Sequence, residues 1–475
     1  MRPDPPLLDS RPEPTRLYRW VVLVFISLAM FGNYYVYDAM APVFDLLGDQ
    51  LEFTDQQLGL LYTVYSIAAV IILLFGGYLI DRFGTKKALT LFAVVCLLGA
   101  AVTAATPEFW TMLTGRFLLG LGSEPLIVAV TTALAKWFKG KELSLAFGVN
   151  LTIARLGSVS ADLSPTWARP LYENWQDPLW LATGIAGISV TGAVLYWILE
   201  RRAERHYRLG EAEETEKLDF DGLEPGPSVD TPGGRSRLGA LWLKIKELYG
   251  FNPSYWYIVA LCVVFYSVLF PFRAFAIYYF QQAHGTSREV GGLLNSMLPF
   301  AAMIATPIFG YLVDRFGRRS LFMTVGSLIL LPLFLAVTYL PPGPDLTVWV
   351  PFLGSFTTPT TLFVVMALLG VAFSLIPAVM WPSVAYIVEQ RRLGTAYALM
   401  TLCQQVGMAV VPWLIGFLND RFLAGPENPA GYAPGMWFFT LLASLGLFFS
   451  YKLWRSERGP GGHGLETITI GSKER

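Results

Sequence analysis

The sequence predicts an all-α membrane protein with twelve transmembrane helices in two six-helix, pseudo-symmetric halves. Of the 475 residues, 54% are hydrophobic and only 15% are charged, whereas a soluble domain is about 25% charged. Apolar runs of about 20 residues recur along most of the chain, and such a run can cross a bilayer. The motif GGYLIDRFGTKK at 76–87 returns as FGYLVDRFGRR at 309–319, which indicates an internal repeat.

The longest polar segment divides the predicted spans six and six. We expect a disordered N-terminal tail at 1–16, an N-terminal six-helix bundle at 17–200, a cytoplasmic linker at 201–253, a C-terminal six-helix bundle at 254–455 and a disordered C-terminal tail at 456–475. The linker is charged and rich in Gly and Pro, so it cannot bury a core. Within it, 238–249 fits an amphipathic helix at the membrane surface. The expected spans are 17–44, 56–81, 86–106, 108–138, 141–169, 177–200, 254–283, 287–314, 319–341, 359–390, 391–421 and 432–455.

Charge and motif content exclude several classes of function. Basic residues crowd alternate loops, which places both termini in the cytoplasm, and a net charge of zero argues against nucleic acid. The chain has no Walker-type phosphate loop, so ATP is not expected as the energy source. The three cysteines lie inside apolar runs and the three histidines are scattered, so neither a disulfide framework nor a metal site is expected. We therefore expect no enzyme activity, no cofactor and no metal.

A single acid and a single base lie at one depth on two neighbouring predicted helices. Glu124 precedes the basic turn at 136–141 by about 15 residues, and Arg155 follows it by about 14. At 1.5 Å rise per residue, both lie roughly 21 Å from the turn, near the middle of a hydrocarbon core about 30 Å thick. Ionisable groups at this depth usually mark a substrate or ion path.

The pair matches the two ends of a dipeptide. An extended dipeptide is about 7 Å long; Glu124 suits its ammonium group, and the planar fork of Arg155 suits its carboxylate. A permanent structural salt bridge between the two residues is the alternative, since buried ion pairs are often neutral for stability. In an intermediate case, they pair when the site is empty and part for the substrate.

The repeated motif predicts a conformational latch between helices rather than a substrate site. Its glycines permit a tight turn and close helix approach, and its aspartate suits the N-terminal end of a neighbouring helix or a basic partner. A weaker echo, GFLNDRF, begins at Gly416. Two related six-helix halves are typical of an alternating-access transporter with a central site. The latch residues are Gly77, Asp81, Arg82 and Gly84 in the first half and Gly310, Asp314, Arg315 and Gly317 in the second.

The latch motif, found twice in a twelve-span chain, resembles the signature of the major facilitator superfamily over the whole chain. Further segments resemble the branch that contains the vertebrate lysosomal dipeptide transporter: FGNYYVYD (31–38), GRFLLGLGSEP (115–125), AKWFKGKELSLAFG (135–148), ARLGS (154–158), FPF (270–272), LNSMLPFAAMIATPIFGYLVD (294–314) and MWPSVAYIVEQRRLGTAYALM (380–400). The resemblance implies facilitated diffusion of dipeptides, with Glu124 on the amine and Arg155 on the carboxylate. Ser123, Pro125 and Arg273 depart from that branch, and the extra cation Arg273 could change the charge preference for substrate.

Other polar residues are candidates for the substrate cavity. Asp38 ends the polar-aromatic run with Tyr37, and it either lines the cavity, carries a coupled proton or is exposed at a helix end. Arg116 either forms part of a gate, links helices, or extends its guanidinium group to the membrane–water interface. Arg273 lies at mid-span, and Asp162 and Arg169 lie nearer the outer mouth. In the second half, aligning Gly157 with Gly407 sets Gln405 opposite Arg155; the remaining pocket candidates are Tyr266, Asn295, Trp381 and Gln404.

The sequence therefore predicts a membrane transporter of small peptides, most simply a dipeptide uniporter. One alternative is a proton-coupled carrier or exchanger of small organic anions that uses Arg155 and Arg273; another is a non-transporting sensor or scaffold. We expect a dipeptide substrate, a lipid bilayer, no nucleic acid and a functional monomer, with an accessory glycoprotein subunit only in a eukaryote. Because the predicted outer loops contain no Asn-x-Ser/Thr acceptor, a bacterial cytoplasmic membrane is favoured over a lysosomal one.

Overall fold

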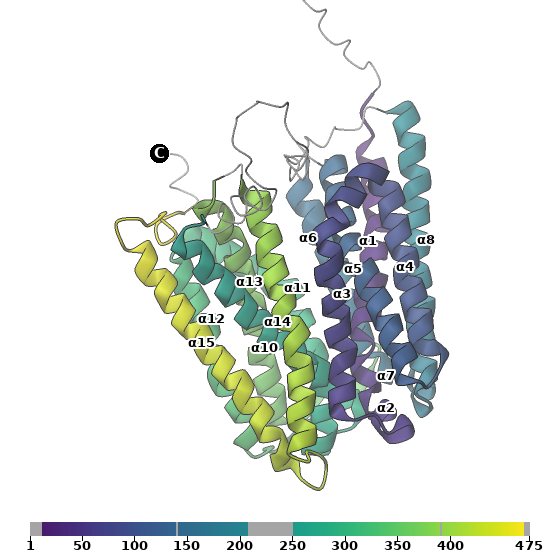
Figure 1. The fold of residues 1–475 in the computed structure, drawn as a ribbon, viewed down its shortest axis with the longest axis vertical. Coiled ribbons are helices and arrows are strands. Elements are labelled where there is room, and N and C mark those ends of the chain that lie inside the picture. The colour runs from purple at the N-terminus through teal and green to yellow at the C-terminus, as the bar shows by residue number, and fades with distance from the viewer. Residues whose placement is uncertain (1–11, 139–140, 208–249, 390–391, 470–475) are drawn as a thin grey trace, which may run out of the picture.

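The computed structural model describes residues 12–138, 141–207, 250–389 and 392–469, and the predicted surface helix at 238–249 lies outside them. The described chain is almost entirely helical, which confirms the all-α prediction. Two helical bundles stand side by side, one from each half of the chain (Figure 1). The helices are α1 (Arg16–Asp38), α2 (Phe44–Leu51), α3 (Asp55–Phe83), α4 (Thr85–Ala105), α5 (Phe109–Phe138), α6 (Leu143–Asp162), α7 (Ser164–Trp167) and α8 (Gln176–His206), then α10 (Pro253–His284), α11 (Arg288–Phe316), α12 (Arg319–Tyr339), α13 (Thr360–Ile387), α14 (Leu393–Arg421) and α15 (Ala433–Glu457).

Eleven segments of the described chain are long and apolar enough to cross a membrane. The remaining predicted span, 141–169, is wrong in length: α6 covers only 20 residues, and α7 follows with Pro165 in its first turn. The predicted span 17–44 likewise ends early, at Asp38, because Pro42 opens a 3₁₀ turn over Ala41–Val43. At both places the proline lacks the N–H group that would continue the helix, and a new turn starts there. Helix α6 still packs in the bundle, against α1 and α11.

The internal repeat is visible in the helix lengths and turns. Helices α3 and α11 each have 29 residues, and α4 and α12 each have 21. Between them stand Gly84 and Gly317, at φ +76° and +65°, a backbone conformation that glycine adopts without steric cost. The tight turn predicted from the motif is therefore confirmed in both halves.

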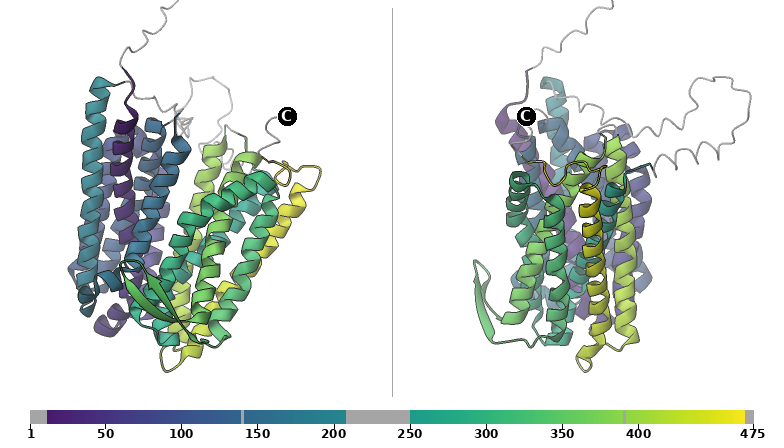
Figure 2. Two further views of the ribbon diagram at one scale, coloured as in Figure 1. Left: turned by 180° about the vertical axis from the view of Figure 1, so that it is seen from behind. Right: turned by 90° about the vertical axis from the view of Figure 1, so that its left-hand side faces the viewer.

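Three segments differ from expectation at the edges of the bundle. Helix α8 runs to His206, so the first six residues of the expected linker, 201–206, are helical. Residues 456–469 are not a free tail, because the Glu466 carboxylate accepts a hydrogen bond from the backbone of Ser320 at 3.1 Å. An antiparallel hairpin of β1 (Asp345–Val350) and β2 (Gly354–Pro359) lies between α12 and α13. Its register pairs Asp345 with Pro359. Figure 2 shows the hairpin lying along the outside of the bundles.

The two halves meet along α3 and α14 and along α6 and α11. Glycine permits this approach, since a Cβ at Gly416 would lie 2.1 Å from the Asp55 carbonyl oxygen, and one at Gly292 would lie 2.1 Å from the Asp162 carbonyl oxygen. We call the end where α1 begins and α15 ends the termini end, and the opposite end the far end. The axes of the two bundles diverge toward the termini end (Figure 2).

Candidate functional site at the centre of the bundle

Glu124 lies midway along α5, half-buried, and both of its hydrogen bonds come from other helices. The Tyr65 hydroxyl of α3 donates to Oε1 at 3.3 Å, and the Gln405 amide of α14 donates to the same oxygen at 3.0 Å. The Tyr65 oxygen also lies 2.7 Å from the Ser123 hydroxyl, which can donate to it while Tyr65 donates to Glu124. These neutral partners orient the carboxylate without neutralising it, so the acid can still bind a cation.

Arg155 lies on α6, half-buried, with its guanidinium held by aromatic rings rather than by an acid. It sits 5.3 Å from the ring centre of Tyr34 on α1 and 5.4 Å from that of Phe373 on α13. Its buried Nη1 has no hydrogen-bond partner. Stacking of this kind holds a guanidinium in place while leaving its fork of donors for a ligand.

Glu124 and Arg155 do not form an ion pair in the described chain, so the permanent salt bridge is wrong for this state. Each charge is held separately, by contacts that include the opposite half of the molecule. An acid and a base that are both uncompensated at mid-depth are costly. A zwitterionic guest would compensate both at once.

The aromatic wall next to the pair includes two of the predicted pocket residues. The Trp381 indole donates to the Tyr266 hydroxyl at 3.1 Å. Tyr266 stacks on Phe270, with 5.3 Å between ring centres, and Phe270 packs against Phe373, the ring under Arg155. Gln404, by contrast, points into the C-terminal half: its amide contacts Met408 at 3.7 Å and its carbonyl oxygen contacts Cys262 at 3.7 Å. Adjacent helical positions face different sides, and Gln405 takes the one that faces Glu124; a role for Gln404 as a substrate ligand stays a prediction.

Tyr37 belongs to a tyrosine cage around Arg116, not to the charged pair. The Arg116 guanidinium lies 5.6, 5.0 and 5.5 Å from the ring centres of Tyr37, Tyr62 and Tyr65, and its Nε donates to the Leu61 carbonyl at 3.2 Å. Arg116 is only 1% exposed, so its guanidinium group does not extend to the membrane–water interface. It links helices α1, α3 and α5 beside the Glu124 partner Tyr65.

Four other polar candidates form a buried cluster nearer the far end, which we call the far gate: Asp38, Asp162, Arg273 and Asn295. Arg273 of α10 binds Asp38 of α1 at 3.2 Å and Asp162 of α6 at 2.9 Å. Asn295 of α11 donates to Asp162 at 2.8 Å. In this state these residues bond across the two halves, and Asp38 is buried rather than exposed at its helix end; a role for Asp38, Arg273 and Asn295 as substrate ligands stays a prediction.

A second seal at the far end uses the echo GFLNDRF. The Asp420 carboxylate of α14 accepts hydrogen bonds from the backbone N–H groups of Asp55 and Gln56, both at 2.9 Å, at the first turn of α3. Asn419 donates to the Asp55 carboxylate at 2.8 Å. An acid at a helix N-terminus gains from the unsatisfied N–H groups and the helix dipole. The contact expected of the latch aspartate is thus made by the third copy, at the opposite end.

The latch residues at the termini end bond within their own half where the structure describes them. Asp314 pairs with Arg319 at 2.7 Å, and the guanidinium of Arg315 lies 5.7 Å from the ring centre of Phe316. A Cβ at Gly310 would meet nothing within 4 Å, so this glycine is not at a close contact. Arg82 is exposed beside Phe83; the surroundings of Gly77 and the side chain of Asp81 lie outside the described part.

The charged contacts therefore distinguish the two ends. At the far end they join the halves: besides the far gate, Arg288 of α11 bonds to Asp45 of α2 at 2.8 Å. At the termini end, the described ion pairs remain inside one half, as in Lys136 with Glu200 at 2.8 Å. We call this arrangement, in which charged contacts join the two halves at the far end, the sealed state.

Gly416→Ala is expected to weaken this sealed state, because the new Cβ would lie 2.1 Å from the Asp55 carbonyl and overpacking costs about 1–3 kcal/mol. Double electron–electron resonance between labels at Asp49 and Glu427, both exposed at the far end, should show a longer distance population. Gly184→Ala is the control, since its Cβ would meet nothing within 4 Å. An unchanged distance distribution in Gly416→Ala would contradict the seal.

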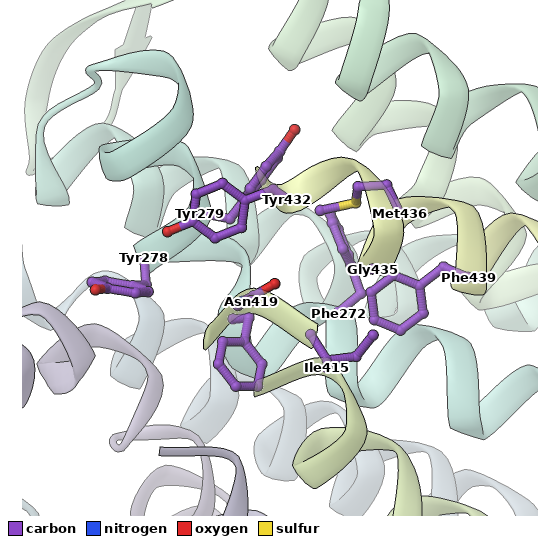
Figure 3. A pocket seen from close by; sticks show the side chains of 10 residues that line it. Phe272, Tyr278, Tyr279, Ile415, Asn419, Tyr432, Gly435, Met436 and Phe439 are labelled. Atoms are coloured by element: carbon purple, nitrogen blue, oxygen red, sulfur yellow. The ribbon is translucent and has the colours of Figure 1, made fainter. Parts of the chain in front are cut away.

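An aromatic cavity at the far end of the C-terminal half is too small for a substrate. It encloses about 10 Å³ between α10, α14 and α15, lined by residues such as Phe272, Tyr279, Tyr432 and Phe439, and Figure 3 shows these rings closing around it. This volume accommodates about one water molecule. The central charged pair remains the better candidate site.

The sequence identified Gln405 as a candidate, but the aromatic residues that hold the pair were not predicted. Tyr34, Tyr65 and Phe373 carry no charge, and aromatic residues at helical spacing are common in packing. Tyr34 had one usable signal: it lies one helical turn before Asp38 in the polar-aromatic run.

Comparison with known proteins agrees with this architecture. The sequence model of the Major Facilitator Superfamily matches residues 26–356 and 272–467. The human protein named lysosomal dipeptide transporter MFSD1 is 29% identical over 97% of this chain and 91% of its own length, and the zebrafish (Danio rerio) protein of that name is 29% identical over 85% and 81%. The hexuronate transporter of Escherichia coli K12 is 21% identical over 92% of this chain and 93% of its own length.

Solved structures show the same fold. A bacterial homologue of the human lysosomal transporter Spinster, in an inward-facing and unoccupied conformation, superposes with a TM-score of 0.68 at 15% identity, covering 93% of this chain and 98% of its own. The nucleoside transporter NupG gives a TM-score of 0.64 at 13% identity, over 92% and 99%.

Proposed function

Because the chain belongs to the major facilitator superfamily, a group of membrane transporters, we propose that it moves dipeptides across a membrane by alternating access. One observation carries the proposal: an acid and a base at mid-depth, on neighbouring helices, are each left without a charged partner. Glu124 would bind the peptide ammonium group and Arg155 the carboxylate. The name of the human and zebrafish relatives supports the same substrate class.

The chemistry of the site favours a zwitterion over a simple anion. An anion carrier built on Arg155 and Arg273 would need both guanidinium groups free, but Arg273 is held by Asp38 and Asp162. Glu124 would also repel an anion. Neutral dipeptides gain two charge-assisted hydrogen-bonded contacts, and a single amino acid is too short to make both.

We propose facilitated diffusion with both termini in the cytoplasm. Basic side chains gather at the termini end, as expected of a cytoplasmic face, so the sealed far end would face outward or into a lumen. A bacterial cytoplasmic membrane is the favoured location, with a lysosomal membrane as the alternative that the curated relatives support. The latch residues would seal the termini end when the far end opens.

Purified protein in proteoliposomes tests the function directly. Liposomes loaded with unlabelled dipeptide should take up labelled dipeptide by counterflow without a pH gradient, and a thermal-shift screen should favour dipeptides over free amino acids, tripeptides and dicarboxylates. Flux that requires a proton gradient would replace uniport by proton coupling. Flux of dicarboxylates but not dipeptides would favour an anion carrier, and the absence of any substrate-dependent flux would favour a sensor.

A further inference from the structure

A groove lies on the outer face of α8 at its termini end, away from the charged pair and the far gate. It measures about 640 Å³ and is lined by Val194, Trp197, Ile198, Arg201, Arg202, Arg205 and His206. These side chains change from apolar to basic along the helix toward the termini end. Nothing in transport through the centre of the bundle requires such a groove.

The acids of α8 that neighbour the arginines of the groove bind other residues of the N-terminal half. Glu200 faces the bundle, where it binds Lys136 at 2.8 Å and Thr85 at 3.1 Å, and Glu204 binds Lys86. Arg201, Arg202 and Arg205 are exposed. In the part of the chain that the structure describes, no ion pair engages these three guanidinium groups.

The apolar part of the groove continues onto the membrane-facing surface. Val194 and Ile198 are 38% and 57% exposed, and with Arg201 and Arg205 they follow the i, i+4, i+7, i+11 spacing of one helical face. Trp197 lies between them, a residue type enriched where hydrocarbon meets headgroups. An acyl chain would therefore contact Val194 and Ile198 while its phosphate lies among the arginines.

We propose that this groove binds one anionic phospholipid at the cytoplasmic membrane surface. Arginine forks match phosphate oxygens, and a basic pocket beside a transmembrane helix on this side is suited to an anionic headgroup. The chain itself contains an alternative anionic occupant for the groove: the segment 211–224 holds seven acids and one lysine. Phospholipid fits better, since the groove is half apolar and that segment is mostly polar.

Native mass spectrometry of the full-length protein in detergent tests the proposal. Titration with phosphatidylglycerol should give one retained lipid at concentrations at which phosphatidylcholine gives none. The triple variant Arg201→Gln, Arg202→Gln, Arg205→Gln should weaken retention at least about tenfold, since each basic residue near an anionic surface contributes a severalfold factor. A matched control removes the same charge from the last turns of α15 and the residue that follows it, at the same end, and should retain the lipid: Lys452→Gln, Arg455→Gln, Arg458→Gln.

Three outcomes would overturn the lipid site. Equal retention of phosphatidylcholine would show that the arginines do not select charge. Displacement of the lipid by inorganic phosphate or glycerol phosphate at similar concentrations would identify a simple anion site. Lipid retention that appears only after the acids of 211–224 are changed to amides would show that this segment occupies the groove. None of these measurements uses dipeptide flux, so they test the lipid site independently of the transport function.

Discussion

Glu124→Gln is expected to abolish dipeptide flux while leaving the protein folded. The amide keeps the size of the side chain and can still accept hydrogen bonds from Tyr65 and Gln405, so packing should survive. It loses the negative charge that an ammonium group requires. Because hydrogen bonds to charged groups contribute about 1.5–3 kcal/mol, affinity should fall by about ten- to a hundredfold, and counterflow should approach background.

Arg155→Ala is expected to have the same effect through the other end of the substrate. Arg155→Lys keeps the charge but loses the planar fork and the stacking on Tyr34 and Phe373, so intermediate flux is expected. Glu108→Gln, the same chemical change at an exposed position, is the control for Glu124→Gln and should transport normally. Size-exclusion chromatography and thermal unfolding would verify that each variant is folded.

Modified peptides assign the two roles separately. In the wild-type protein, N-acetylation of a dipeptide should weaken binding through Glu124, and C-terminal amidation should weaken it through Arg155. Glu124→Gln should no longer distinguish the free from the acetylated peptide, yet it should still distinguish acid from amide. Wild-type flux in either Glu124→Gln or Arg155→Ala would refute the assignment, and an unchanged preference for the free amine in Glu124→Gln would refute the role of the acid.

The depth of this pair could be predicted because helical rise converts sequence position into height. Glu124 and Arg155 lie at similar distances on either side of one turn, and their helices are neighbours in the chain. Tyr34 and Phe373 lie far from Arg155 in sequence, and no charge marks them. Only the packing of α1, α6 and α13 shows that they hold the guanidinium.

The far gate could not be predicted for a similar reason. Asp38 and Arg273 were each identified as polar residues in apolar surroundings, but 235 positions separate them. Charge alone does not say whether such a residue faces a substrate or a distant partner. The echo at Gly416 was also recognised. Its contact with α3 was not predicted, because α14 ends at the far end of the molecule whereas α3 and α11 end at the termini end.

Helix ends were predicted least well where proline interrupts an apolar run. Hydropathy continues through Pro42 and Pro165, so the predicted spans did too, whereas α1 and α6 end just before these prolines. Other prolines, such as Pro125 in α5 and Pro412 in α14, lie inside helices, so proline alone did not mark the ends. The turn glycines Gly84 and Gly317 were predicted correctly, because the glycine that closes the motif by itself indicates a tight turn. Local rules thus determined the turns and the depth of the site, while contacts between halves required the folded chain.

The second large effect is expected at the far gate, where Arg273→Ala should destabilise the sealed state. The change would leave Asp38 and Asp162 buried without their shared cation, and removing one partner of a buried pair costs about 3–5 kcal/mol. The ratio of far-closed to far-open molecules should fall by more than about a hundredfold. Labels at Asp49 and Glu427 should report a longer far-end distance, and counterflow should fall because the cycle must pass through the sealed state.

Two further variants separate charge from packing at this gate. Arg169→Ala removes a pair with Glu289 that also joins the halves, but Arg169 is 80% exposed, and exposed pairs contribute about 0–1 kcal/mol; its distance distribution should match that of the wild type. Asp38→Asn, Asp162→Asn, Arg273→Gln combined keep the shape of the cluster without its charges and should restore much of the far-closed population. An unchanged distance in Arg273→Ala, or no recovery in the neutral triple variant of a folded protein, would show that charge balance across α1, α6 and α10 does not hold the far end closed.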